Sequence, residues 1–270
     1  MKKLLKVVLY VAGTTVAIIL LIFVYVIIVP SPAEKIDKVV SQKLGLSTVE
    51  SVNNIEQKII PLSYDLIIKK YPVFSNKKVE KWYVLDPDSY KITVSKILNE
   101  STAVGLDAQD AIAFCPATVY LKYWGDQRSL TNYLIHSIHE SLHALSCHSK
   151  SVLPPVWEEG LTDYFAINVL GNYVGMTADA HMAFPYQVKV VNYLTDFISE
   201  KDLVSIYIEK NDDRLKKKID EKFGADTYDK LMVDMNAVFY GASYSDGFQS
   251  NSEVDSAFIR IEELLNIKGE

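Results

Sequence analysis

Two histidines and a glutamate in the segment His139-Glu140-Ser141-Leu142-His143 have the residue types and the spacing of a metal-dependent hydrolase. On a helix, His139 and His143 lie one turn apart on the same face, so both imidazoles can bind one zinc ion. Glu140 lies beside them and can take a proton from a metal-bound water without being a ligand itself. The segment fits the H-E-x-x-H signature and predicts a hydrolase that uses one Zn²⁺ ion, with peptide bonds as the expected substrate.

A catalytic zinc ion needs a third protein ligand and keeps its fourth position for water. The candidates are the remaining histidines and the acidic side chains Glu158, Glu159 and Asp163, which follow in Trp157-Glu158-Glu159-Gly160-Leu161-Thr162-Asp163-Tyr164. Glu159 and Asp163 are four residues apart, so they share one face of a helix and can both point at the metal. Asp163 is then expected to accept a hydrogen bond from the second ring nitrogen of a ligand histidine, which fixes the tautomer of that ring.

These two segments together resemble the gluzincin clan of metallopeptidases, in its thermolysin-like and aminopeptidase-like branches, over residues 130–165. In that clan the third ligand is a glutamate on the following helix, often directly before a glycine. The resemblance therefore implies that Glu159 is the ligand, and that Glu158 is a neighbour that faces solvent or caps the helix. It also implies an oxyanion donor downstream, for which Tyr186 is the first candidate and His181 the second.

The other histidines and the two cysteines have less specific interpretations. His136 shares the helix face of the motif but lies a turn away from the metal, so packing or substrate contact is expected. His148 suits an interaction with the end of the helix dipole. Cys115 and Cys147 can form one disulfide in an oxidising compartment, or remain two buried thiols. A thiolate ligand from Cys147 is disfavoured, because one short helix cannot easily supply three ligands and leave an open position.

An uncharged segment of 23 residues, 7–29, follows Lys2, Lys3 and Lys6 near the start of the chain. At about 1.5 Å per residue it is about 34 Å long, enough to cross a bilayer. A cleaved signal peptide would have a shorter apolar region that ends in small residues, whereas this one ends in Val-Ile-Ile-Val. We therefore expect an uncleaved single-pass anchor in the cell membrane, with its N-terminus cytoplasmic and the rest of the chain extracytoplasmic.

The charge balance argues against nucleic acid as a partner. The formal net charge is −6, and three of the 28 basic side chains precede residue 30, so the remainder is more acidic still. An acidic surface without a basic patch does not suit nucleic acid.

Hydrophobic patterning predicts the elements that position the motif. Residues 81–85 and 90–94 are expected to be strands, separated by the turn-forming Asp-Pro-Asp. Residues 111–124 are also strand-like, but Pro116 demotes them to an edge or bulged strand, where an extended peptide could add itself. Helical spacing of leucines predicts the active helix over 130–147, and mainly helices after a second one that starts near Trp157.

The expected fold class is α+β, a zincin-like two-lobed domain behind one transmembrane helix. Four parts are predicted: a cytoplasmic tip and anchor (1–29), a stalk (30–50), an α/β lobe with the active helix (51–150), and a helical lobe with the third ligand (151–270). At 270 residues the chain suits one catalytic domain with a sizeable core.

The predicted function is a membrane-tethered zinc metallopeptidase with Glu140 as general base. The Gly-x-Met-x-Asn signature that related aminopeptidases use to hold a free amino terminus does not precede the active helix, which favours endopeptidase action. Two alternatives from other classes stay open. One is a catalytically silent, peptidase-like binding module at the membrane surface, and the other is an envelope structural protein whose histidines are incidental.

Overall fold

The computed structural model describes residues 14–15, 30–98, 106, 109–147, 152–178, 184–243 and 252–266. Except for Thr14 and Thr15, the predicted membrane span 7–29 lies outside these residues, as do His148 and His181. In the part of the chain that is described, no helix is both long enough and apolar enough to cross a bilayer.

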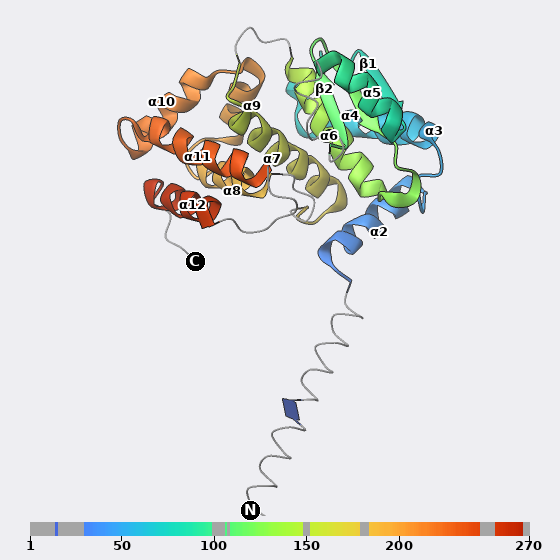
Figure 1. Cartoon of the computed structure of the whole chain (residues 1–270), viewed down its shortest axis with the longest axis horizontal. Coiled ribbons are helices and arrows are strands. Elements are labelled where there is room, and N and C mark those ends of the chain that lie inside the picture. Colours follow the sequence, from blue (N-terminus) through green and yellow to red (C-terminus); the bar gives the residue numbers. More distant parts are fainter. Residues whose placement is uncertain are drawn as a thin grey trace, which may run out of the picture.

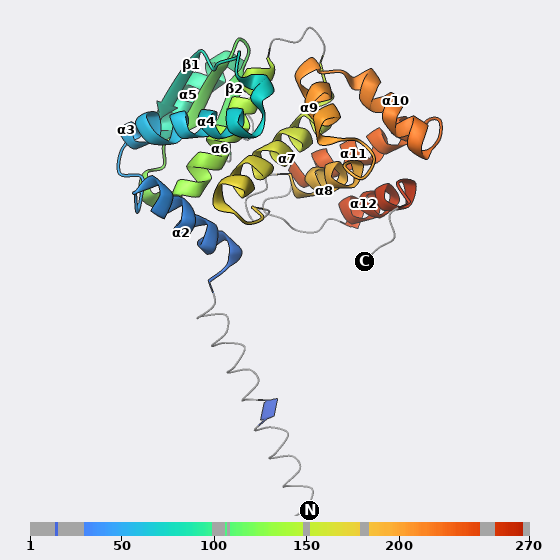
Figure 2. The same ribbon diagram turned by 180° about the vertical axis from the view of Figure 1, so that it is seen from behind.

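Helices and a small sheet form the first half of the domain, which we call the sheet half (Figures 1 and 2). Its elements, in chain order, are α2 (Pro32–Leu44), α3 (Val52–Asn54), the π-helical turn η1 (Ile55–Ile59), α4 (Ile60–Lys70), the 3-10 turn η2 (Pro72–Phe74), β1 (Lys81–Leu85), α5 (Pro87–Leu98), β2 (Ala111–Phe114), β3 (Thr118–Lys122), the 3-10 turn η4 (Gly125–Gln127) and α6 (Leu130–Ser146).

In the described residues of the second half, which we call the helical half, there are six helices. They are α7 (Pro155–Val174), α8 (Pro185–Leu194), α9 (Glu200–Glu209), α10 (Asp212–Phe223), α11 (Thr227–Ser243) and α12 (Ser252–Leu264). Helix α7 lies between the two halves and packs against both α6 and α8 (Figure 1). One continuous apolar core runs through both halves, from Ile36 in α2 to Leu265 after α12.

The sheet is mixed and has the strand order β1-β3-β2. β1 pairs parallel with β3, and β2 pairs antiparallel with β3, so β2 is an edge strand. Strand β1 has the predicted bounds. The segment 111–124 was expected to be one strand interrupted by Pro116, whereas it forms a hairpin with Pro116 in the turn, preceded by a cis peptide bond. Only its first half occupies the edge.

The prediction of a strand over residues 90–94 is wrong, because this segment lies inside α5. Asp86 begins the helix: its carboxylate accepts a hydrogen bond from the backbone N–H of Ser89 at 2.9 Å. Pro87 takes the first helical position, where its missing N–H costs nothing. Tyr90 and Val94 are four residues apart and both fully buried, which is helical spacing.

The segment expected to be a stalk is part of the domain. Helix α2 starts at a capping box, in which Ser31 and Glu34 satisfy each other's backbone N–H groups. Its residues Ile36 and Val40 are fully buried in the core, and the helix packs against α6 and α7. We infer that burial of this apolar face holds α2 against α6.

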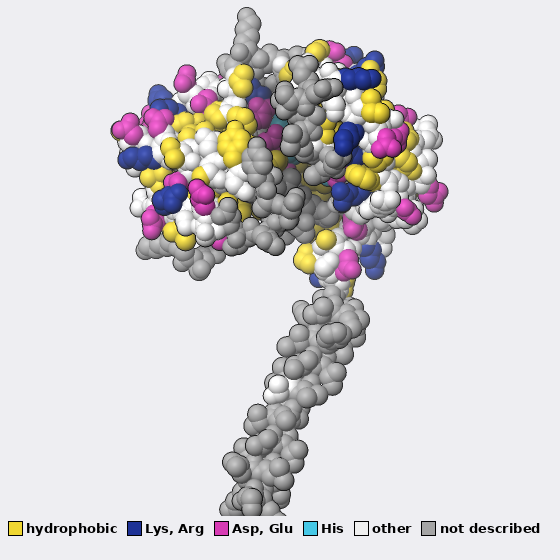
Figure 3. All heavy atoms as spheres, in the orientation of Figure 1, with side chains coloured by type: hydrophobic (Ala, Val, Ile, Leu, Met, Phe, Trp, Pro, Cys, Tyr) yellow, Lys and Arg dark blue, Asp and Glu magenta, His cyan; other side chains and the backbone are white. Residues whose placement is uncertain are grey.

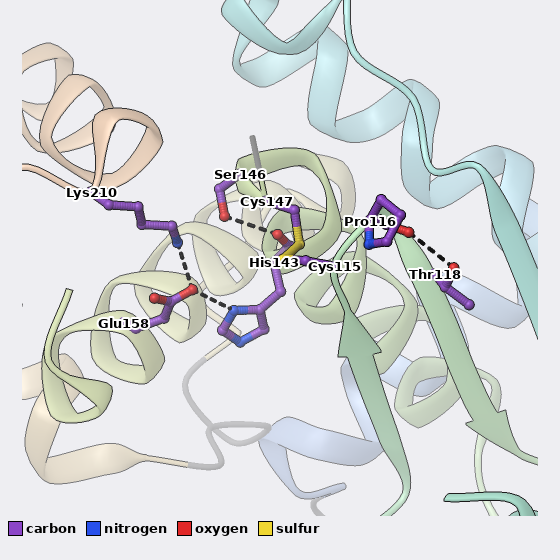
Figure 4. Close-up of a disulfide and its surroundings, with 8 residues drawn as sticks. All are labelled: Cys115, Pro116, Thr118, His143, Ser146, Cys147, Glu158 and Lys210. Atoms are coloured by element: carbon purple, nitrogen blue, oxygen red, sulfur yellow. Dashed lines mark hydrogen bonds and ion pairs between the residues drawn. A yellow bond between two sulfur atoms is a disulfide. The ribbon is translucent and has the colours of Figure 1, made fainter. Parts of the chain in front are cut away.

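Cys115 and Cys147 are joined by a disulfide in the structure (Figure 4). Cys115 follows edge strand β2 and Cys147 caps the C-terminus of α6, so the bond connects the sheet edge to the end of α6. Cys147 is consequently not a thiolate ligand in this structure.

Removing the disulfide is expected to destabilise the protein. Its cysteines are 32 residues apart in sequence, and closing a loop of that size in the unfolded chain is worth about 3–4 kcal/mol. The double variant Cys115→Ser/Cys147→Ser should lose about that much free energy of unfolding in a denaturant titration. Reductant should destabilise the wild type and leave the variant unchanged. Equal stability of the two oxidised proteins would contradict this expectation.

Candidate metal centre and cleft

A cleft of about 750 Å³ lies between the two halves, and the motif of α6 lines it. Ser129 caps α6 by accepting a hydrogen bond from the backbone N–H of Asn132. One face of the helix buries Leu134, Ile138 and Leu142 in the core, which fixes its rotation. His139, Glu140 and His143 consequently face the cleft. Figure 3 shows acidic and histidine side chains gathered in this hollow.

Three ligand atoms from two helices meet at one point in the cleft. The Nε2 atoms of His139 and His143 are 3.1 Å apart, and they lie 3.2 Å and 3.3 Å from Oε2 of Glu159. A tetrahedral zinc ion with bonds of about 2.0–2.1 Å separates its ligand atoms by roughly 3.3–3.4 Å. The three atoms thus form a nearly equilateral triangle of the size that one zinc ion requires. His139, His143 and Glu159 are brought together as the sequence predicts.

Each of these imidazoles also has a carboxylate partner at its second nitrogen. Nδ1 of His139 donates to Oδ1 of Asp163 at 2.8 Å, and Nδ1 of His143 donates to Oε1 of Glu158 at 3.2 Å. With a proton held on each Nδ1, the Nε2 atoms of both rings face Glu159 and are the nitrogens that can bind a metal once they carry no proton. Zinc ligation through Nε2 needs this placement of the Nδ1 protons.

The partner of His139 is the predicted one, whereas Glu158 corrects an expectation. Glu158 was expected to face solvent or cap α7, but its side chain points into the cleft and contacts both His143 and Lys210 (Figure 4). Asp163 is held from its other side, since Oδ2 accepts a hydrogen bond from the backbone N–H of Phe184 at 2.7 Å. Both orienting carboxylates are therefore anchored by later parts of the helical half.

The electrostatics of the cluster favour a positive charge at the point where the ligand atoms meet. Burial lowers the pKa of His143, but Glu159 and Glu158 outweigh it and raise this pKa to about 9. Burial raises the pKa of Glu159, but the two histidines outweigh it and hold this pKa well below its ordinary value. An environment that stabilises protonated imidazoles next to an ionised carboxylate also stabilises a bound cation.

Glu140 stands apart from the ligand triangle but in the same cleft. Its side chain is buried, and this burial raises the pKa of its carboxyl group despite the opposing effect of His139 and His143. A carboxylate with a raised pKa is a better proton acceptor near neutral pH than an exposed glutamate. Its environment suits a general base.

Comparison with known proteins finds no match: no protein-family model, no curated protein and no solved structure is detectably similar to this chain.

Tyr186 is not brought to the cluster. Its hydroxyl is 3.4 Å from Oδ1 of Asp255 and its ring packs on Phe258, both in α12, and the side chain does not line the cleft. Tyr186 is the second residue of α8 and its side chain faces α12, so this downstream tyrosine has a packing role here. Tyr186 is not retained as the oxyanion donor. The second candidate, His181, lies outside the described residues.

His136 lines the cleft one turn before His139 and is not part of the triangle. Its Nε2 atom is 3.5 Å from Oδ2 of Asp110. The same carboxylate accepts a hydrogen bond from Nε1 of Trp124 at 2.7 Å and pairs with Arg128 at 3.1 Å. His136 is thus held at the cleft wall next to the start of β2, as expected for a substrate-contact or packing residue.

Gly160, the glycine after Glu159, is required by the packing of two helices. A Cβ atom at Gly160 would lie only 2.8 Å from Cβ of the buried Gln187, so the absence of a side chain lets α8 approach α7 directly behind Glu159. Gly160→Ala is expected to reduce the free energy of unfolding by about 1–3 kcal/mol through overpacking.

The matched variant is Gly241→Ala, where the added Cβ would meet only the end of the Val254 side chain. It should cost less, because a terminal methyl group of Val254 can move aside more easily than Cβ of Gln187, whose backbone also lies 3.5–3.6 Å from the Cβ added at Gly160. The gain in helix propensity from alanine applies to both positions. Chemical denaturation of both variants measures the difference. A Gly160→Ala protein as stable as the wild type would show that the two helices can separate freely.

Proposed function

We propose that the protein is a zinc metallopeptidase. The observation that carries the proposal is the triangle of Nε2 of His139, Nε2 of His143 and Oε2 of Glu159, with both second ring nitrogens tied to carboxylates, next to buried Glu140 in a cleft. The donor set of two imidazoles and one carboxylate is typical of catalytic zinc sites, which leave a position for water or substrate.

Each group of the site has a role in this proposal. When bound, zinc would supply Lewis acidity for the substrate carbonyl and for an attacking water. His139, His143 and Glu159 hold it, and Asp163 and Glu158 keep the two rings in the ligating tautomer. Glu140 accepts the proton of the attacking water and passes it to the amine that leaves.

The wall of the cleft supports a peptide as substrate. Edge strand β2 pairs with β3 on one side only, and its residues Ala111, Ile112 and Ala113 line the cleft. An extended peptide can add to such an edge by main-chain hydrogen bonds, with its carbonyl groups near α6. Because this form of recognition needs no chain terminus, endopeptidase action is the form we propose.

We also propose that the catalytic domain is tethered outside the cytoplasm by a membrane anchor over 7–29. The basic residues before this segment and its length of 23 uncharged residues support the anchor and its orientation. The disulfide between Cys115 and Cys147 suits an oxidising compartment. Digestion of the domain by a membrane-impermeant protease added outside intact cells tests the orientation.

The experiment that tests the proposed activity is cleavage of internally quenched peptides with blocked termini by the full-length protein in detergent. We expect zinc-dependent cleavage that a chelator removes and added Zn²⁺ restores. Stoichiometric zinc without cleavage of any peptide in a diverse mixture would favour the silent binding module. Absence of both would favour the structural protein.

A further inference from the structure

The ion pair between Lys210 and Glu158 connects the end of α9 to the candidate metal site. Nζ of Lys210 lies 2.5 Å from Oε1 of Glu158, and the same oxygen accepts the hydrogen bond from Nδ1 of His143 (Figure 4). Lys210 lines the cleft, yet the residue is only 5% exposed, and its ammonium group lies over the ring of Tyr207 at 4.2 Å. Few lysines are buried to this extent unless they are paired.

The backbone at this position supports a role for the side chain. Lys210 ends α9 in the left-handed conformation, with φ of 52° and ψ of 41°. Glycine or asparagine is the usual residue there, because a Cβ atom clashes with the backbone in this conformation; glycine has no Cβ, and asparagine offsets the cost by local hydrogen bonds. The end of α9 points into the cleft. A lysine in this unfavourable conformation is consistent with a side chain that is needed there.

The charges around the cluster explain what this side chain can do. Besides the ligand Glu159, the cleft holds Glu140, Glu158 and Asp163 close to the two histidines. Asp163 is fixed by a backbone N–H, whereas Glu158 is fixed by an ammonium group. A glutamate has three rotatable side-chain bonds, so without a fixed partner Glu158 would be free to turn toward a bound divalent cation. The ion pair keeps it at Nδ1 of His143.

From this arrangement we propose that Lys210 is a positioning residue of the metal site. It holds Glu158 against His143, and Glu158 in turn holds His143 with Nε2 toward the ligand position. The inference rests on the proposed zinc site and deepens it by adding a second orienting pair, which couples the end of α9 to metal affinity. Lys210 acts through Glu158 and is not itself a ligand.

The test is the zinc affinity of full-length variants in detergent, measured by competition with a chromophoric chelator. Lys210→Met keeps the aliphatic stem and removes the charge, and it should raise the zinc dissociation constant by about 10–100-fold. Lys210→Arg restores a cation and should stay within about threefold of the wild type. Lys189→Met is the control, because Lys189 pairs with Glu262 on the surface of α8 and α12 and does not line the cleft.

A double-mutant cycle separates positioning from a general effect on folding. Glu158→Ala should raise the dissociation constant by a similar factor. The double variant Glu158→Ala/Lys210→Met should bind zinc no more weakly than the weaker single variant, since both act through one contact. If Lys210→Met does not fold, Glu158→Ala alone tests the inference. An unchanged zinc dissociation constant of the Glu158→Ala protein would overturn it.

The failure of this inference and the failure of the proposed site give different results. Wild-type zinc affinity in a folded Lys210→Met protein, or fully additive losses in the cycle, would overturn the role of Lys210 and leave the zinc site in place. A wild-type protein that binds no zinc would overturn both.

Discussion

Glu140→Gln is expected to bind zinc like the wild type and to lose at least about 10³-fold in kcat. Glutamine is close to isosteric with glutamate but cannot accept a proton from the attacking water. General acid–base catalysis by one side chain contributes about 10²–10⁴-fold, and here the same group would serve twice, as base and then as acid. The ligand triangle does not include Glu140, so metal content should be unchanged.

The measurement is the rate of hydrolysis of a quenched peptide, together with the zinc content of the same sample. Glu221→Gln is a matched control, because Glu221 is an exposed residue of α10 that pairs only loosely with Lys217, at 3.8 Å. Full activity in Glu140→Gln would refute the role assigned to this residue. Loss of zinc together with activity would instead indicate that Glu140 supports the metal site.

Glu159→Ala is expected to reduce zinc affinity by at least about 10³-fold and to abolish hydrolysis with it. This substitution removes one of three ligand atoms and leaves the two imidazoles, which also lose the carboxylate 3.2–3.3 Å away that attracts the cation. The loss should exceed that of an orienting residue, for which about 10–100-fold is typical.

Glu158→Ala is the informative comparison, because it removes the same side chain from the adjacent position of α7. Chelator competition on the two variants should rank Glu159 well above Glu158. Equal losses would mean that the two glutamates have interchangeable roles, and a Glu159→Ala protein with wild-type zinc affinity would rule out Glu159 as the third ligand.

The centre of the site could be predicted because it depends on local helical spacing. His139 and His143 on α6, and Glu159 and Asp163 on α7, are pairs at i and i+4, so each pair lies on one face once its helix is placed. Helical spacing alone does not indicate that the two helices face each other. The resemblance to the gluzincin motif predicts it.

The supports of the site could not be predicted in the same way. Lys210 is 52 residues from Glu158 in sequence, and no local pattern indicates that the end of α9 reaches the cleft. The motif resemblance makes Tyr186 a candidate oxyanion donor by its position in the sequence. In the structure α8 lies against α12, and the Tyr186 ring packs on Phe258 instead. The role of Glu158 could have been predicted from the sequence. Glu158 is adjacent to the proposed ligand Glu159, and His143 still required a carboxylate partner to orient its ring.

The errors in the fold have similar causes. For α5, apolar residues alternate over 90–94 as they do in a strand, but the Asp86-Pro87 pair before them is typical of a helix start as well as of a turn. For α2, the amphipathic pattern was recognised, but only the tertiary structure shows that its apolar face is buried against the active helix.

The most direct test of the proposed metal centre is X-ray absorption spectroscopy at the zinc edge of the full-length, zinc-loaded protein. The proposal predicts one zinc ion per chain, with two imidazole nitrogens and carboxylate or water oxygens at about 2.0–2.1 Å and no sulfur ligand. A shell of sulfur at about 2.3 Å, fewer than two imidazoles, or no stoichiometric zinc would contradict it.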